Sequence, residues 1–533
     1  MNLIGEKLSD EQLEEVIHSM KTNVEDKNDN EITIELTPDR SDLFGIEGLA
    51  RAIKQYLGLQ NGLKKFTVDS PKLHVRASRL PYRPYLAAAV VRNVSMTDAF
   101  IKSLMNIQDV LTDTIGRKRK KVAIGIHDFD KIIPNINYIE VNPDEKIVPL
   151  DTNEEMTLAE TLERIPKGRD YGHILAGLKK LPVWTDAKGI FSFPPIINSD
   201  RTRVTEKTRN LLVELTGIDE EAVLQTLNII VTNFAERGCT IESVKIFHGE
   251  KSEITPTLNP TFMDVGIDEI NKLVGLDLRK IDIIDSLNKM GYDVTENKAL
   301  LRVFIPAYRT DILHKVDVIE DVAIGYGFNK FTPQLPSIAT VGKVHSVEKL
   351  SSKVRQLMAG YGFQEIIRPV LTNQENLFDK MNVKREDIIK LENPASEEYT
   401  CMRTWILPSL IEVLSANKHV EYPQNIFEVG DAVIPAENEE TMSKTIRKVS
   451  CVVAHSKSNY AEIKGFVESL LKQMNVSYSF KENSNETLIE GRRTDIFSNG
   501  KLIGFVGELT PVVLEQWKIE MPCSAFEISL EGL

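Results

Sequence analysis

Apolar residues recur along this chain at two spacings, that of a helix face and that of a strand. The clearest helical series is Phe100, Leu104, Ile107, Leu111 and Ile115, which predicts a long amphipathic helix that ends at Gly116. Other series predict helices near 43–53, 267–274, 281–290, 347–358 and 407–414, strands at 85–91, 122–126, 300–305, 365–371 and 426–429, and a hairpin turn at 296–298. Helices and strands mixed in this way predict an α+β protein.

The length of 533 residues is too great for one hydrophobic core, so several domains are expected. Breaks in the apolar pattern place four domains at about residues 1–75, 80–245, 254–335 and 340–533. The first is expected to begin with a helix that Ser9 and Gln12 cap reciprocally. The last two are joined by the segment Leu335–Ile338, which is expected to be a linker.

Charge and composition narrow the classes of function. The chain has 65 Lys and Arg against 78 Asp and Glu, a formal charge of −13, which argues against general coating of nucleic acid but leaves room for local RNA contact. The 42% hydrophobic and 27% charged residues are those of an ordinary soluble protein. The four cysteines have no paired spacing and are expected to be reduced thiols of a cytosolic protein, and no segment has the length and apolarity of a membrane span.

Four acidic residues gather at the start of one predicted helix. Asp311 stands at the helix entry, and Asp317, Glu320 and Asp321 follow within one helical turn of each other. Carboxylates placed in this way repel one another unless they are solvated or neutralised, and such oxygen ligands suit Mg²⁺. The residues alone leave two interpretations open, the solvated acidic face of an amphipathic helix and a magnesium site.

Several phrases of the sequence resemble one family. They are LTPDRSDLFGIEGLARAIKQYLG from residue 36, AIGIHDFDKI from 123, SFPPIINS from 192, TEKTRNLLVELTGID from 205, SEEYTCMRTWILPSLIEVLSAN from 396 and IFEVGDAV from 426. In this order they resemble the β subunits of phenylalanyl-tRNA synthetases, in the compact archaeal and eukaryotic type. The resemblance extends over nearly the whole chain.

The resemblance implies an α+β multidomain fold. An editing-type α/β domain and small helical or winged modules would precede a C-terminal antiparallel sheet with helices, shaped like a class II synthetase core without its catalytic residues. The family works as a cytoplasmic (αβ)₂ heterotetramer that joins phenylalanine to its tRNA using ATP. The α subunit would activate and transfer phenylalanine, while this chain would scaffold the assembly and hydrolyse mischarged tyrosyl-tRNA.

The expected loss of catalytic residues can be checked against the sequence. A class II core holds the α-phosphate of ATP with an arginine on the strand after the helix at 407–414, because a planar guanidinium orients phosphoryl oxygens. Here that strand reads Phe427-Glu428-Val429-Gly430-Asp431, and the second expected arginine position, near the C-terminus, reads GFVGELTP from Gly504. This chain is therefore not expected to make an aminoacyl-adenylate alone.

The resemblance also suggests functional residues. Asn198, Ser199 and Asp219 are expected to line the editing pocket, although Asn198 and Ser199 could equally cap the following helix. The segment shows no serine or cysteine triad, so a positioned water is the expected nucleophile. The family pattern assigns Mg²⁺ to Asp311, Asp317, Glu320 and Asp321, remote from the phosphates of ATP. The alternatives are an autonomous aminoacyl-tRNA deacylase that needs no α partner and a non-enzymatic scaffold protein.

Overall fold

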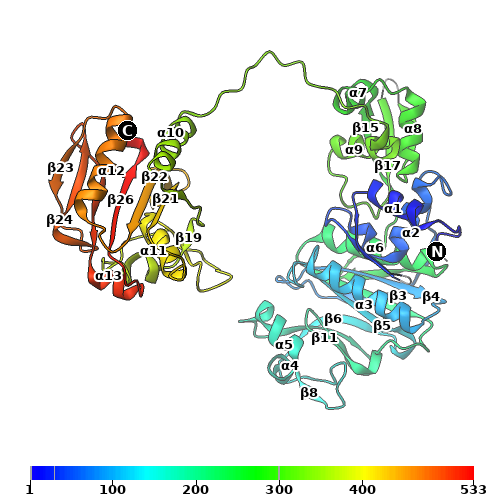
Figure 1. Cartoon of the computed structure of the whole chain (residues 1–533). Coiled ribbons are helices and arrows are strands. Elements are labelled where there is room, and N and C mark those ends of the chain that lie inside the picture. The colour runs from blue at the N-terminus through cyan, green and yellow to red at the C-terminus, as the bar shows by residue number, and fades with distance from the viewer. Residues whose placement is uncertain (1–2, 29–30, 298–299, 533) are drawn as a thin grey trace. The chain divides into compact units, whose positions relative to one another are not determined.

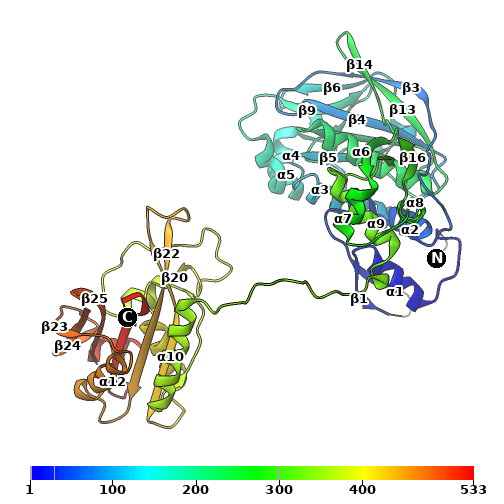
Figure 2. The ribbon, with the colours of Figure 1, turned by 90° about the horizontal axis from the view of Figure 1, so that it is seen from above.

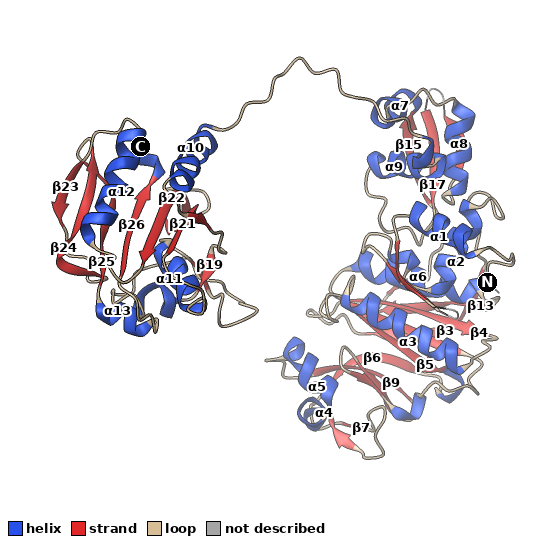
Figure 3. Ribbon diagram, in the orientation of Figure 1, coloured by secondary structure: helices blue, strands red, loops and turns tan. Residues whose placement is uncertain are grey.

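The computed structural model describes residues 3–28, 31–297 and 300–532. The chain forms two compact units, Met1–Leu335 and Pro336–Leu533 (Figure 1). Both units contain helices and strands, so the predicted α+β, multidomain organisation is confirmed (Figure 3). The first unit holds the first three predicted domains, and the boundaries between those three stay predictions.

A small module opens the first unit. Its elements are α1 (Asp10–Ser19), β1 (Asn23–Lys27), β2 (Ile32–Glu35), η1 (Ser41–Leu43) and α2 (Ile46–Tyr56). The predicted capping box is confirmed, since the Gln12 backbone N–H donates to Ser9 Oγ at 3.2 Å and the Ser9 N–H donates to Gln12 Oε1 at 3.0 Å. These two bonds satisfy donors that a helix N-terminus otherwise leaves unpaired.

The second module is built on a ten-stranded sheet. Its strand order is β11-β10-β9-β6-β3-β13-β4-β12-β5, with β14 paired to β13. The strands are β3 (Val68–Ala77), β4 (Tyr85–Arg92), β5 (Val122–Asp128), β6 (Ile136–Val141), β9 (Leu181–Asp186), β10 (Gly189–Phe193), β11 (Ile197–Asn198), β12 (Leu211–Gly217), β13 (Thr240–His248) and β14 (Lys251–Thr255), and a small hairpin adds β7 (Lys146–Ile147) and β8 (Met156–Thr157). The boundary predicted near residue 75 falls inside β3.

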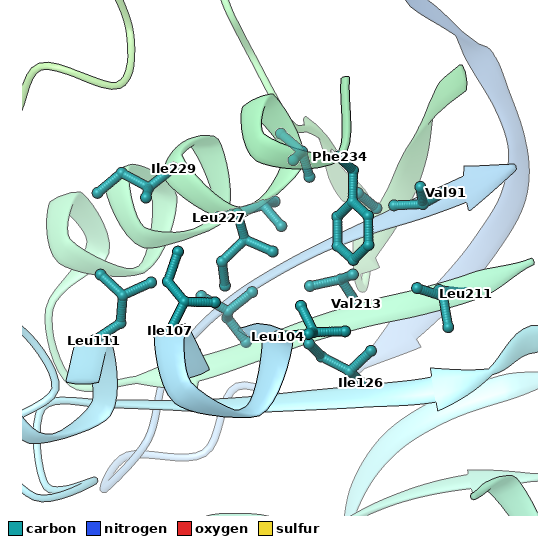
Figure 4. Close-up of a cluster of buried hydrophobic side chains, with 14 of the residues drawn as sticks. Val91, Leu104, Ile107, Leu111, Ile126, Leu211, Val213, Leu227, Ile229 and Phe234 are labelled. Atoms are coloured by element: carbon teal, nitrogen blue, oxygen red, sulfur yellow. The ribbon is translucent and has the colours of Figure 1, made fainter. Parts of the chain in front are cut away.

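Helices cover this sheet and bury its core. They are α3 (Asp98–Asp113), η2 (Phe129–Lys131), α4 (Leu158–Arg164), α5 (Pro166–Tyr171), η3 (Gly172–Leu175), η4 (Asp200–Thr202) and α6 (Glu220–Glu236). Figure 4 shows one core cluster, in which Leu104, Ile107 and Leu111 of α3 meet α6 and the strands. The predicted helix is therefore confirmed, but it ends at Asp113. Gly116 lies beyond it, where a Cβ atom would be 2.4 Å from the Thr112 carbonyl oxygen.

The third module packs three helices on a three-stranded sheet of order β15-β17-β16. Its elements are β15 (Thr261–Gly266), α7 (Ile267–Val274), α8 (Lys280–Lys289), β16 (Asp293–Asn297), β17 (Leu300–Ile305), α9 (Lys315–Tyr326) and η5 (Phe328–Lys330). The three helices predicted in this module are confirmed as α7, α8 and α9. The first two are followed by glycines of positive φ, Gly275 at +77° and Gly291 at +85°. β16 and β17 pair as the predicted hairpin, although Lys298 of its turn lies outside the described residues.

The second unit is a seven-stranded sheet of order β18-β21-β22-β26-β25-β24-β23, antiparallel except for the β18–β21 pair. The strands are β18 (Gln364–Glu365), β21 (Gln424–Pro435), β22 (Ser443–Ala454), β23 (Ser479–Glu482), β24 (Leu488–Ser498), β25 (Lys501–Leu509) and β26 (Cys523–Ser529). Figures 1 and 2 show α10 (Ser346–Gly360) and α12 (Tyr460–Gln473), which share one core cluster with the sheet, whereas α11 (Leu407–Ala416) and α13 (Pro511–Gln516) share another. The smaller elements are β19 (Leu371–Thr372), η6 (Glu375–Asp379), β20 (Cys401–Met402) and η7 (Leu530–Gly532).

Two strand predictions in this unit were wrong in extent. The strand predicted at 365–371 is reduced to its ends, β18 and β19, because the segment between them contains Pro369, which cannot donate to a ladder. The strand predicted at 426–429 continues to Pro435. Gly430 does not end it. A Cβ atom there would lie 2.5 Å from Glu428 Oε1, so glycine makes room for a buried side chain.

Candidate functional site

A pocket of about 290 Å³ opens in the second module between α3, β5 and the segment from β10 to η4. Its apolar lining includes Leu104 of α3 and Ile124 and Ile126 of β5, and the segment Phe193–Ser199 completes it. This volume is close to the lower end of the roughly 300–1,000 Å³ that small-molecule sites usually have. The pocket can therefore hold one side chain of a ligand.

A buried polar group lies in this pocket. Glu214 of β12 accepts a hydrogen bond from Ser192 Oγ at 2.7 Å, and its Oε1 lies 3.6 Å from Nε2 of His127 on β5. His127 Nδ1 lies 2.9 Å from Thr202 Oγ1. Glu214 Oε2 and His127 Nε2 are both buried and have no hydrogen-bond partner within the described part of the chain. Because an unpaired buried polar atom is costly, these two atoms are prepared for a ligand or a water.

Two of the three residues predicted for the pocket line it. Asn198 Nδ2 donates to the Ile126 carbonyl oxygen at 3.3 Å, and Asn198 Oδ1 lies 3.4 Å from Ser192 Oγ. Ser199 also lines the pocket, and its hydroxyl accepts from the Arg201 N–H at 3.4 Å as the cap of η4. For Ser199 the capping alternative and the pocket placement are thus both observed, and a role in editing stays a prediction.

Asp219 lies elsewhere. It caps α6 by accepting from the Ala222 N–H at 2.9 Å, and it pairs with Lys121 at 3.2 Å. The hydrogen bond from Ala222 is the main reason that its pKa is lowered. Asp219 is not among the residues that line the pocket. Asp219 follows the pocket segments in the sequence because an acid at this position caps the start of α6.

Cationic side chains also line the pocket. Arg119 donates to the carbonyl oxygens of Pro195 and Ile196 at 3.1 and 2.7 Å, and its guanidinium lies 4.3 Å from the ring centre of Tyr171. Lys167 lies nearby, and burial together with the positive charge of Arg119 lowers its pKa. Such groups suit an anionic ligand, because phosphate oxygens accept hydrogen bonds from cations. The basic run at residues 117–121 therefore contributes Arg119 to the site.

The four acids predicted to bind magnesium lie near the start of α9, and each is paired with a group of the chain itself. Arg309 donates to Asp311 at 2.7 Å and to Asp321 at 2.6 Å. Asp317 accepts from the backbone N–H groups of residues 313 and 314, and Glu320 pairs with Lys21 at 2.7 Å. Across residues 3–28, 31–297 and 300–532, no three His, Cys, Asp or Glu side chains are grouped so that they could hold a metal ion.

Arg309 is the centre of this arrangement. Burial, the largest effect, opposes its charge, but Asp321, Tyr292 and Asp311 together raise its pKa above the usual range. The Tyr292 hydroxyl donates to Asp321, which is itself only 2% exposed. The acids as arranged do not fit a magnesium ion, since such an ion requires Arg309 and Lys21 to release them. The magnesium site stays a prediction.

In a class II core, the strand after α11 carries a phosphate-binding arginine. Here that strand, β21, carries Glu428, which is 2% exposed. Arg403, which precedes α11, donates to both oxygens of Glu428, at 2.5 and 3.1 Å, and to the Asp431 carbonyl oxygen at 2.9 Å. Next to it, Glu527 accepts from two backbone N–H groups at the start of α11 and from Lys448 at 2.8 Å. The guanidinium of Arg403 is thus held on all three of its nitrogens by its own chain.

Three sequence profiles match the chain. They are described as the phenylalanyl tRNA synthetase beta chain CLM domain at residues 332–530, the tRNA synthetase B5 domain at 263–328 and the B3/4 domain at 90–247. Two of them are named for tRNA synthetases, which gives the class of protein.

Relatives define the class more closely. The phenylalanine–tRNA ligase beta subunit of Archaeoglobus fulgidus is 41% identical over 515 residues, which is 96% of this chain and 93% of the relative. That of Methanocaldococcus jannaschii is 40% identical over 536 residues, 99% of this chain and 98% of the relative. A crystal structure of an N-terminal fragment of the phenylalanyl-tRNA synthetase beta-subunit from Pyrococcus horikoshii matches with a TM-score of 0.59 and 38% identity, over 61% of this chain and 97% of that one.

The chain belongs to the family of phenylalanine–tRNA ligase beta subunits, as its sequence phrases predicted. Within the described ranges, none of the helices is both long enough and apolar enough to span a bilayer.

Proposed function

We propose that this chain is the scaffolding and editing subunit of a cytoplasmic phenylalanine–tRNA ligase. It pairs with an α subunit in an (αβ)₂ heterotetramer, and that complex binds ATP, phenylalanine and phenylalanine tRNA. The observation that carries the editing proposal is Glu214, which lines the pocket and whose Oε2 is buried with no hydrogen-bond partner among the described residues. A buried acceptor of this kind suits a substrate with one more hydroxyl than phenylalanine has.

Different residues of the pocket contact different parts of the tyrosine side chain. The apolar lining takes the ring, and Glu214 accepts the hydrogen bond of the phenol hydroxyl. Phenylalanine would leave the same carboxylate oxygen unpaired, and a site built to bind a hydroxyl rejects the analogue without it by roughly 10⁴–10⁵. Arg119 and Lys167 attract the phosphate end of the tRNA. Water then attacks the ester carbonyl, and the bond to the ribose oxygen breaks to give free tyrosine and a tRNA hydroxyl.

The test uses tyrosyl-tRNA and phenylalanyl-tRNA as substrates for the αβ complex. Glu214→Gln keeps the shape but loses a negative acceptor, and we expect preference for tyrosine to fall by about 100-fold or more. Asp219→Asn is the matched control, because asparagine also caps a helix and Asp219 lies outside the pocket lining. Equal hydrolysis by the Glu214 variant and the native chain would refute the assignment.

The same proposal states that this chain does not activate phenylalanine. A phosphate-binding arginine must be free to meet its ligand, whereas Arg403 is held by Glu428 and the Asp431 carbonyl oxygen. ATP–pyrophosphate exchange should therefore be absent with this chain alone and present once the α subunit is added. Exchange by the isolated chain would overturn this part of the proposal.

The two alternative functions make different predictions for the same preparations. An autonomous deacylase hydrolyses tyrosyl-tRNA without any α subunit and does not need to co-purify with one. A non-enzymatic scaffold co-purifies with α but shows no change in hydrolysis when Glu214 is substituted. Only the editing subunit requires both the partner for aminoacylation and Glu214 for proofreading.

Magnesium enters the proposal through Asp311, Asp317, Glu320 and Asp321. When bound, the ion would neutralise carboxylates that Arg309, Lys21 and the start of α9 neutralise here. Magnesium binding therefore competes with these ion pairs. If the ion binds, the melting temperature measured with magnesium should differ from the melting temperature measured with a chelator. No change would leave these acids as structural ion-pair partners only.

A further inference from the structure

A second hollow, of about 930 Å³, lies in the same module at a different part of the sheet. It is formed by β3, the ends of β4 and β13, the 3-10 helix η2 and the beginning of β6. It shares no lining residue with the pocket around Glu214. The editing proposal leaves this hollow without a role.

Glu242 of β13 lines the hollow and is 1% exposed. Its Oε2 accepts from Arg92 Nε at 3.0 Å and lies 3.8 Å from Lys72 Nζ. Its Oε1 is buried and accepts no hydrogen bond in the portion of the chain that the structure describes. A ligand with an N–H or O–H group would relieve the cost of this unpaired oxygen.

Cations and rings surround Glu242. Lys72 and Arg76 are exposed on β3, and the guanidinium of Arg92 lies 4.7 Å from the ring centre of Phe129. His74 and Phe247, whose rings meet edge to face at 5.7 Å, also line the hollow. Three cations against one carboxylate leave the hollow positive in a chain whose formal charge is −13.

We propose that this hollow binds an unpaired nucleotide of the tRNA on which the ligase acts. A nucleotide presents a phosphate to Lys72 and Arg76, a flat base to the rings, and an exocyclic amine to Glu242 Oε1. Unpaired RNA is recognised in this way, by stacking and by hydrogen bonds to base edges. An acidic peptide fits less well, because its carboxylates would face Glu242 and it has no use for the rings. The inference rests on the proposed tRNA ligase function.

The first experiment measures binding to the αβ complex of uncharged phenylalanine tRNA and of short single-stranded RNA by fluorescence anisotropy at several salt concentrations. We expect Lys72→Ala with Arg76→Ala to weaken binding by about tenfold and to lower the salt slope by about 1.4, since each phosphate contact to a single strand contributes about 0.7. Lys272→Ala with Lys289→Ala is the matched control outside the hollow and should bind like the native complex. Equal binding by the Lys72 and Arg76 variant would overturn the proposal.

The second experiment reads the base. Glu242 Oε1 accepts from the amines of cytosine or adenine, so oligo(C) and oligo(A) should bind more tightly than oligo(U). Glu242→Gln places an amide beside Arg92 and should remove or invert this preference by about tenfold. An unchanged preference, or displacement of RNA by polyglutamate at equal charge, would refute nucleotide recognition. If Glu242→Gln lowers the melting temperature, its effect on binding is not specific to the base. The proposal is then tested by Lys72→Ala with Arg76→Ala, because these two side chains are exposed.

Failure of the editing proposal would look different. RNA without an attached amino acid has no ester for the editing pocket to hydrolyse. Its binding at the hollow therefore does not depend on Glu214. Glu214→Gln should keep native RNA affinity, and Lys72→Ala with Arg76→Ala should raise KM for tyrosyl-tRNA while kcat stays unchanged. A fall in kcat with native KM would mean that the hollow acts through the pocket and not as an RNA contact.

Discussion

Replacing Arg309 by methionine tests how the acids of α9 are kept stable. Methionine keeps much of the volume and removes the guanidinium that joins Asp311 and Asp321. Removing one partner of a buried ion pair costs about 3–5 kcal/mol, because the other charge stays buried without compensation. The entropy of unfolding is about 2.1 cal/mol/K per residue, or about 0.7 kcal/mol/K for a unit that runs from Met1 to Leu335, so the first unit should lose about 4–7 °C in Tm.

The pH dependence gives a sharper test of the same variant. Burial is the largest effect on Asp311 and raises its pKa, but the charge and hydrogen bonds of Arg309 outweigh it, so the pKa is lowered. Its contribution to stability is therefore present above the ordinary value of 3.8 and is lost as the pH falls through the lower folded value. In Arg309→Met the lowering by Arg309 is lost and that by Arg40 remains, so burial weighs more and the pKa of Asp311 rises relative to the native chain. Part of the lost stability should therefore return as the pH is lowered from neutral.

The assay is thermal unfolding of the full chain as the pH is lowered from neutral, with and without magnesium. Arg302→Met is the matched control, because Arg302 forms a partly exposed pair with Asp264 at 2.9 Å in the same module, worth about 0–1 kcal/mol. Equal losses for both variants, or a Tm that falls on acidification in Arg309→Met as in the native chain, would refute the reasoning. Magnesium that raises the Tm of the variant only would show that Arg309 occupies the place of the ion.

Two further substitutions probe the pocket and the second unit. In Gly125→Ala the new Cβ would lie 2.1 Å from Glu214 Oε1, so we expect tyrosyl-tRNA hydrolysis to be lost while aminoacylation by the αβ complex persists. At Gly465 a new Cβ would meet nothing within 4 Å among the described residues beyond its own helix backbone and chain neighbours, so Gly465→Ala should leave both rates unchanged. Native editing rates in Gly125→Ala would show that the space beside Glu214 is not the substrate site. Glu428→Ala leaves Arg403 buried and unpaired, so thermal unfolding of the second unit should reveal a loss of about 3–5 kcal/mol, and a loss below about 1 kcal/mol would contradict the buried-pair argument.

The sequence predicted elements well where one face of a helix is buried. Leu104, Ile107 and Leu111 have the helical period because they point into one core, and that period is local in the sequence. Glu214 was missed because it lies in an apolar strand, LLVELTG, whose residues are all buried. Its signal was present, since a lone acid within such a run is rare and must have a polar partner. The partner Ser192 is 22 residues away, and no spacing rule connects the two residues.

Arg309 and Arg403 explain why the acids were harder to interpret than the helices. From the sequence alone, Asp321 suggests a metal ligand, because it is one of four neighbouring acids. Glu428 suggests the loss of a phosphate site, because it stands on the strand where a class II core has an arginine. In the structure each acid is buried against an arginine, 12 residues away in one case and 25 in the other. A buried carboxylate must be neutralised, but a metal, a ligand and a guanidinium all meet that requirement. Which of them does so depends on where the connecting segments fold, and that information resides in tertiary packing.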